Sequence, residues 1–260
     1  MKLKIATCLG AILLLVSASI FLASLKAQSI QNSEAKVTLQ QLQPENGVIP
    51  VEIQSPQANF KVPNAVENIS FVVKNNTNKN IRAFCLAYSI QIERNKVVSQ
   101  DTFYRTVETF VHKDIRESGR LKPITPGQET IVAENGETSY ETGSIIRGIE
   151  AKIDYVEFED GTTLGANKKG KQLVSLIRDG ASKYKDFLAH SYIEKGKSID
   201  VIVSLIQADD IPNELEFKSD QQNLGAKLYR RYIRRVYEIG GSLELNDFIN
   251  RTLVTPKVLE

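Results

Sequence analysis

The chain has 260 residues, of which 42% are hydrophobic and 25% charged, a composition that excludes a largely disordered polar chain. The formal net charge is +2, but three lysines lie in the first 27 residues, and the remainder carries 30 basic against 31 acidic residues. This balance argues against a strongly basic nucleic-acid-binding protein. Cys85 is the single cysteine after residue 27, which excludes an intramolecular disulfide there.

Residues 1–27 have the pattern of an export signal. Lys2 and Lys4 precede an apolar run from Ile5 to Leu25. A cleaved signal peptide and a retained N-terminal anchor both remain open, because about 20 apolar residues are enough to cross a bilayer. In either case we expect the chain from residue 28 onward to be exported, into the periplasm or the extracellular space.

Residues 28–47 are rich in Gln, Ser and Asn, which predicts a polar linker without fixed structure. From residue 48 to 165 the sequence changes to short β-prone runs separated by turn residues, a pattern typical of an antiparallel β-sandwich. Turns are predicted at 75–80 and at Asp160-Gly161. The segment from Phe103 to Ile115 fits a helical face as well as a strand, so its state stays open.

The closing strand of this region alternates with period two. Ile149, Ala151, Ile153 and Tyr155 are expected to share one face of it. The acidic residues around it are expected to be solvated strand and hairpin charges, with Glu157 and Glu159 pointing outward. By the same alternation argument, Cys85 is expected to be a buried, inert thiol.

The order of these features resembles the immunoglobulin-like or fibronectin-like sandwich modules of exported bacterial proteins. The resemblance covers about residues 48–165 and is carried by the turn at 74–81, the long strand after it, the Pro-Gly turn at 123–127 and the closing strand with Asp160-Gly161. The cysteine pair and core tryptophan of antibody-type domains are absent. The resemblance implies a spacer, an adhesin or a partner-binding platform.

Residues 166–260 show helical periodicity and predict a small α-helical C-terminal domain. The first helix is expected from about Lys171 to Ile193, and the second after Ser198 as N-cap. The third should begin near Ser219 and end at the glycine pair 240–241, with a short fourth over 246–253. The predicted fold is therefore an all-β antiparallel, Ig-like sandwich followed by a helical domain.

The third predicted helix carries the candidate contact site. At about 100° per residue, five basic residues fall on one arc, opposite an apolar arc. These residues are Lys227, Arg230, Arg231, Arg234 and Arg235. Such a face suits an anionic membrane surface or an acidic envelope protein, and the alternative is a solvated face without a partner. The predicted domain has 16 basic and 13 acidic residues, which is too mild an excess for nucleic acid.

No catalytic, cofactor or metal site is predicted. The two histidines, His112 and His190, fall in different predicted domains, and His190 is expected to be partly buried. Phosphate-binding, nucleophile-elbow and zinc motifs are absent from the sequence. The leading hypothesis is an exported, non-enzymatic binding or structural module of the cell envelope. The alternative is a hydrolase that acts on a cell-surface polymer through carboxylates of both domains. The oligomeric state stays open.

Overall fold

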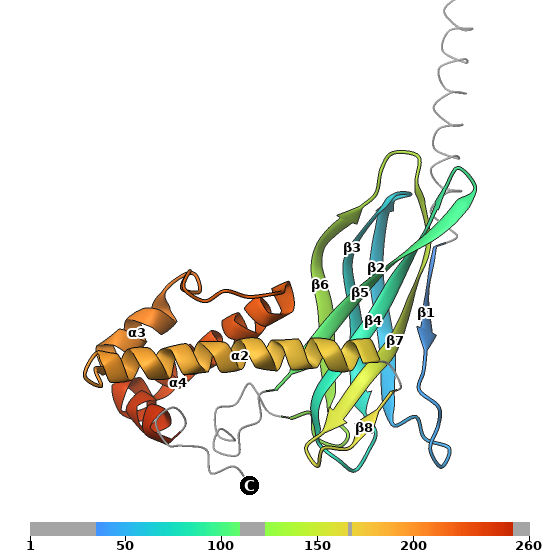
Figure 1. Ribbon diagram of the computed structural model, residues 1–260. Helices are drawn as coiled ribbons and strands as arrows, with labels where there is room; N and C mark the ends of the chain where they lie inside the picture. Colours follow the sequence, from blue (N-terminus) through green and yellow to red (C-terminus); the bar gives the residue numbers. More distant parts are fainter. Residues whose placement is uncertain (1–34, 110–122, 166–167, 252–260) are drawn as a thin grey trace, which may run out of the picture.

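The computed structural model describes residues 35–109, 123–165 and 168–251, which form two β-sheets followed by three helices (Figure 1). The strands are β1 (Lys36–Gln40), β2 (Val51–Val62), β3 (Ala65–Asn75), β4 (Ile81–Arg94), β5 (Val97–Glu108), β6 (Glu129–Ser139), β7 (Ile145–Phe158) and β8 (Thr163–Leu164). The helices are α2 (Lys168–Glu194), α3 (Ile199–Gln207) and α4 (Asp220–Ile249). A β-rich region followed by a helical C-terminal region is therefore confirmed.

The two sheets pack face to face around one hydrophobic core. The first sheet has the order β1-β7-β4-β5, with β8 also pairing with β7, and the second has the order β2-β3-β6. Alternate residues of both sheets point into this core, for example Phe71 and Val73 from β3 and Leu86 and Ile90 from β4. The ambiguous segment after Phe103 is strand as far as Glu108, and its part from residue 110 lies outside the described residues.

Strand β1 corrects two expectations. It pairs with β7 in parallel, Lys36 opposite Gly148, so the first sheet is mixed rather than antiparallel. It also lies inside the stretch expected to be an unstructured linker. Val37 and Leu39 pack against the core while the residues between them stay exposed. Two apolar residues in register with β7 are sufficient to add this strand, although the surrounding composition is polar.

Three β-bulges in the β4–β7 pair change which side chains face outward. The bulges leave Arg82, Arg147 and Asp154 without a partner across the ladder. After Asp154 the alternation changes phase, so Tyr155 leaves the inter-sheet core for the outer face. The expected shared face of Ile153 and Tyr155 is therefore wrong, because an uninterrupted period of two does not allow for an extra residue.

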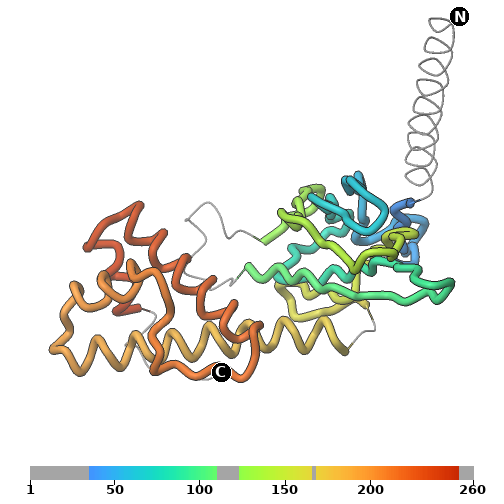
Figure 2. The backbone as a smooth tube through the Cα atoms, turned by 90° about the horizontal axis from the view of Figure 1, so that it is seen from above, coloured from blue at the N-terminus to red at the C-terminus, as the bar shows by residue number. Residues whose placement is uncertain are grey.

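Helix α2 connects the two regions (Figures 1 and 2). Its first turns cover the outer face of the first sheet, where Leu173 and Val174 pack on Cys85 and Tyr155. Gly170 permits this contact, because a Cβ atom there would lie 2.7 Å from the Cβ of Tyr155. Cys85 is buried as expected, and burial raises the pKa of its thiol to about 12.

The second half of α2 packs with α3 and α4 around a separate apolar core. Helices α2 and α4 cross at two glycines: a Cβ on Gly180 would lie 1.8 Å from the carbonyl oxygen of Gln222, and one on Gly225 would lie 1.9 Å from that of Ile177. Ser219 caps α4 by accepting a hydrogen bond from the Gln222 N–H. Gly241 has a non-helical conformation and divides α4 into two segments. This confirms the predicted break there.

Candidate functional site

The five basic residues of the predicted site lie on α4, but they do not form one exposed face. Arg231 and Arg235 are exposed, Lys227 and Arg234 are half-buried, and Arg230 is 7% exposed. The expectation that these arginines are uniformly solvated is therefore wrong for Arg230 and Arg234.

Arg230 and Arg234 are turned toward the end of α3. Arg234 donates from Nε to the carbonyl oxygen of Ile206 (2.7 Å) and from Nη2 to that of Ala208 (3.0 Å). Arg230 donates from Nη2 to the carbonyl oxygen of Asp209 (2.8 Å). Carbonyl groups at a helix C-terminus lack intrahelical partners and carry a partial negative charge, so guanidinium groups stabilise them. These two arginines hold α3 against α4.

The remaining exposed arc of α4 combines basic and apolar side chains. At about 100° per residue it holds three basic and three apolar residues, together with the exposed acidic residues Asp220 and Glu238. We call it the α4 stripe: Leu224, Lys227, Leu228, Arg231, Arg235 and Ile239. Ile239 is 60% exposed, and Arg235 pairs with Glu238 at 3.0 Å. Exposed aliphatic residues interleaved with cations are the composition of a helix that lies at a membrane interface.

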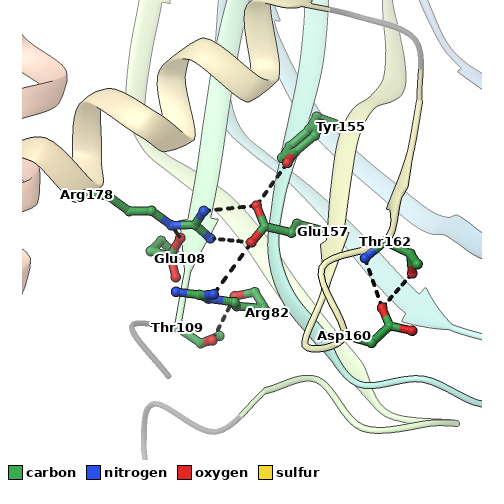
Figure 3. A network of polar contacts seen from close by, with 8 residues as sticks. All are labelled: Arg82, Glu108, Thr109, Tyr155, Glu157, Asp160, Thr162 and Arg178. Atoms are coloured by element: carbon green, nitrogen blue, oxygen red, sulfur yellow. Dashed lines mark hydrogen bonds and ion pairs between the residues drawn. The ribbon is translucent and has the colours of Figure 1, made fainter. Parts of the chain in front are cut away.

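A second polar cluster lies between α2 and the first sheet, and the sequence did not indicate it (Figure 3). Arg178 of α2 donates to both carboxylate oxygens of Glu157, at 2.9 and 3.0 Å, and to Glu108 at 2.6 Å. Arg82 approaches Glu157 at 3.7 Å, and the Tyr155 hydroxyl donates to it at 2.9 Å. Two carboxylates from β5 and β7 are thus held by one guanidinium group.

The electrostatics of this cluster favour the ionised form of Glu157. Burial alone would raise the pKa of Glu157, but hydrogen bonds from Arg178 and Tyr155 and the nearby positive charges outweigh it and lower that pKa. Burial and the neighbouring Glu157 raise the pKa of Tyr155 to about 12. Glu157 was expected to be a solvated outward charge. It does point to the outer face, but α2 covers that face, so the expectation of solvation is wrong.

The other acidic residues of this strand and its hairpin are not gathered into a site. Asp154 accepts the Gly170 N–H at 2.8 Å in the first turn of α2, a favourable position for a negative charge. Asp160 accepts from the N–H and hydroxyl of Thr162, and its pKa is lowered by Lys79 and by these bonds. Within residues 35–109, 123–165 and 168–251, no group of three His, Cys, Asp or Glu side chains could hold a metal ion.

An open hollow of about 270 Å³ lies on the outer face of the first sheet, at the end opposite α2. Lys36, Arg147 and Glu150 line it together with uncharged residues. Arg147 is already paired with Glu93 at 2.8 Å.

His190, expected to be partly buried, is exposed and contacts Glu194, while His112 lies outside the described residues. We find no catalytic arrangement among these groups in the described part of the chain.

No protein-family model matches the chain, and no curated protein matches it. Among solved structures, the chain is similar to a hypothetical protein from Peptoclostridium difficile 630. The identity is 14% and the TM-score 0.27, and the match covers 51% of this chain and 92% of that chain. No helix among the described residues is long and apolar enough to span a membrane.

Proposed function

We propose that the protein is an exported, non-enzymatic binding module of the cell envelope that contacts an anionic membrane surface through the α4 stripe. The two-sheet region serves in this proposal as an immunoglobulin-like or fibronectin-like platform. The N-terminal sequence supports export, either as a cleaved form or with residues 1–27 retained as an anchor.

The composition of the α4 stripe is the observation that carries this proposal. Arg230 and Arg234 have a structural use in the α3 contact, but Arg231 and Lys227 make no ion pair with any residue that the structure describes. Leu224 and Ile239 remain 40% and 60% exposed on the same arc. A bilayer interface accommodates the charges and the apolar side chains together.

The alternative, a carboxylate hydrolase, receives less support. A hydrolase of this class needs one protonated carboxyl group as acid and a second carboxylate nearby. Glu108 and Glu157 are close to one another, but both accept hydrogen bonds from Arg178, and the lowered pKa of Glu157 keeps it ionised. Both also belong to the β region, whereas the hypothesis required carboxylates from both regions.

Vesicle binding tests the proposal. The exported form is mixed with phosphatidylcholine vesicles, with and without phosphatidylglycerol, at low and high salt. We expect binding only to the anionic vesicles. The variant Lys227→Gln/Arg231→Gln/Arg235→Gln should bind on the order of 100-fold more weakly, since each basic residue near a charged surface contributes about 1 kcal/mol.

A matched control removes the same number of charges from the β region. Lys36→Gln/Lys96→Gln/Lys152→Gln should bind as the native chain does, because these exposed residues lie far from α4. Equal loss in both variants would indicate a net-charge effect and contradict the proposal. Absence of vesicle binding, with salt-sensitive binding to an acidic envelope protein instead, would replace the membrane by that partner.

A further inference from the structure

Five strands form the open edges of the two sheets, and all but β5 are short or interrupted; β8 has only two residues. Edge strands expose unpaired N–H and C=O groups that can pair with another chain, so proteins usually shorten or distort them. Strand β1 has five residues. Strand β2 contains Pro56 and three register shifts, and the Gln41 side chain bonds both the N–H and the C=O of Ile53. Strand β6 has a register shift near Gly136.

The remaining edge strand, β5, has none of these interruptions. Its 12 residues pair with β4 without a register shift, and they include no glycine or proline. The two strands are joined by Asn95 and Lys96, which have φ angles of 52° and 67°, as in the tight turns that suit a regular hairpin. Val97 and Val98 at this end are 68% and 63% exposed. β5 is therefore a long, regular edge.

The hydrogen-bond pattern shows which backbone groups of β5 are available. The N–H of Thr109 donates to the carbonyl oxygen of Arg82, which continues the β4–β5 register. In an antiparallel pair the residues alternate, so the odd-numbered residues of β5 bond to β4 and the even-numbered ones point away. Among the strands that the structure describes, β5 has no neighbour on that side. The backbone N–H and C=O groups of Val98, Gln100 and Thr102 therefore point away from β4 and have no strand partner among the described residues.

The charged residues of β5 are arranged so that two copies of this strand, paired antiparallel, would be complementary. A two-fold axis at Phe103 would place Asp101 of each copy opposite Arg105 of the other and would bring no like charges together. The same register pairs Thr102 with Tyr104, and both have outward-directed backbone groups. Arg105 already pairs with Glu134 of β6, yet its side chain is 37% exposed and its guanidinium group has further N–H donors.

We propose that two copies of this chain associate through antiparallel pairing of their β5 strands, which joins the two mixed sheets into one. Closed two-fold dimers are the commonest symmetric assemblies, and self-complementary surfaces produce them. Helix α2 packs on the outer face of the sheet, crosses β5 and continues beyond that edge to the helical region (Figure 1). The proposal goes beyond the membrane-binding function and does not depend on the α4 stripe.

Sedimentation velocity over a range of protein concentrations tests the proposal on the exported form. We expect a reversible dimer. Gln100→Pro removes one outward N–H from each copy without removing a bond to β4, and it should weaken the dimer more than ten-fold. Gln100→Ala keeps that N–H and should leave the dimer unchanged. Circular dichroism checks that both variants remain folded.

A charge exchange tests the register independently. Asp101→Arg places two arginines opposite each other and should weaken the dimer on the order of ten-fold. Asp101→Arg/Arg105→Asp/Glu134→Arg should restore it, because the third change keeps an ion pair between positions 105 and 134. A native chain that stays monomeric, or a dimer that Gln100→Pro leaves intact, would overturn the proposal. Vesicle binding through the α4 stripe would survive either result, so failure of one proposal is distinguishable from failure of the other.

Discussion

The two ends of α2 make contacts of different kinds. Its first turns lie on the β-sheet through a small apolar cluster and a group of buried charges centred on Arg178. Its second half crosses α4 at two glycines within a large apolar core. The crossing of α2 and α4 therefore depends on close packing, whereas the junction between the two regions depends strongly on charge. A substitution that disturbs packing should therefore affect mainly the helix crossing, and one that removes a charge should affect mainly the junction with the sheet.

The largest effect is expected at the helix crossing. Gly225→Ala places a Cβ 1.9 Å from the backbone carbonyl oxygen of Ile177, a contact that only movement of a helix can relieve. We expect the helical region to lose about 3 kcal/mol or more, near the upper end for overpacked cores. Urea denaturation followed by far-ultraviolet circular dichroism measures this loss. Ser182→Ala, at an exposed position of α2, is the control and should be neutral. Equal stability of the two variants would contradict the close crossing.

The next effect is expected at the junction. Arg178→Met removes the cation that Glu108 and Glu157 share and leaves Arg82 at 3.7 Å from Glu157. We expect a loss of about 2–3 kcal/mol, because weakly compensated buried charge is costly. Hydrogen exchange should show faster exchange in the first turns of α2 and little change at the helix crossing. Lys171→Met removes an exposed charge from the same helix and serves as the control.

Rescue would identify charge as the cause. Adding Glu108→Gln and Glu157→Gln to Arg178→Met removes the two buried negative charges and should recover part of the lost stability. If the triple variant is no more stable than Arg178→Met, the contribution of Arg178 is packing of its aliphatic stem rather than charge.

The sequence predicted secondary structure better than it predicted the tertiary contacts between residues. Helical periodicity located α2 and the break at Gly241 because each signal is local. The bulge at Asp154 could not be predicted from alternation, since one added residue moves Tyr155 to the face opposite Ile153. For the same reason the cluster around Arg178 was missed, because its members come from α2, β4, β5 and β7 and meet only through the fold.

The candidate site shows the same limit. The arc of five basic residues on α4 was correct as helix geometry, but the sequence does not tell where α3 ends in space. Arg230 and Arg234 face the terminal carbonyls of α3, and Arg231 and Arg235 do not. The position of α3 therefore determines which arginines of α4 have structural contacts and which remain exposed for binding.

Acid should weaken the junction by a smaller amount than deletion of Arg178, because it neutralises one carboxylate and leaves the guanidinium group in place. The folded-state pKa of Glu157 is lowered from its ordinary value of 4.5, so its contribution to stability is present above about pH 4.5 and is lost as the pH falls through the lowered pKa. Denaturation at neutral and at acid pH should show a smaller difference for Glu157→Gln than for the native chain. An unchanged difference would assign the acid sensitivity to other groups.

The smallest effects separate the two kinds of arginine on α4. Arg234→Gln removes the donors to the carbonyl oxygens of Ile206 and Ala208, and we expect a loss of about 1 kcal/mol, the usual contribution of such hydrogen bonds. Arg231→Gln changes an exposed side chain with good helix propensity, so stability should stay within about 0.5 kcal/mol. Vesicle binding should show the reverse order, with Arg231→Gln the weaker binder, because only that side chain belongs to the α4 stripe. Thermal denaturation and vesicle sedimentation of these two variants therefore test whether different arginines of α4 serve stability and binding. Parallel changes in both measurements would show that it does not.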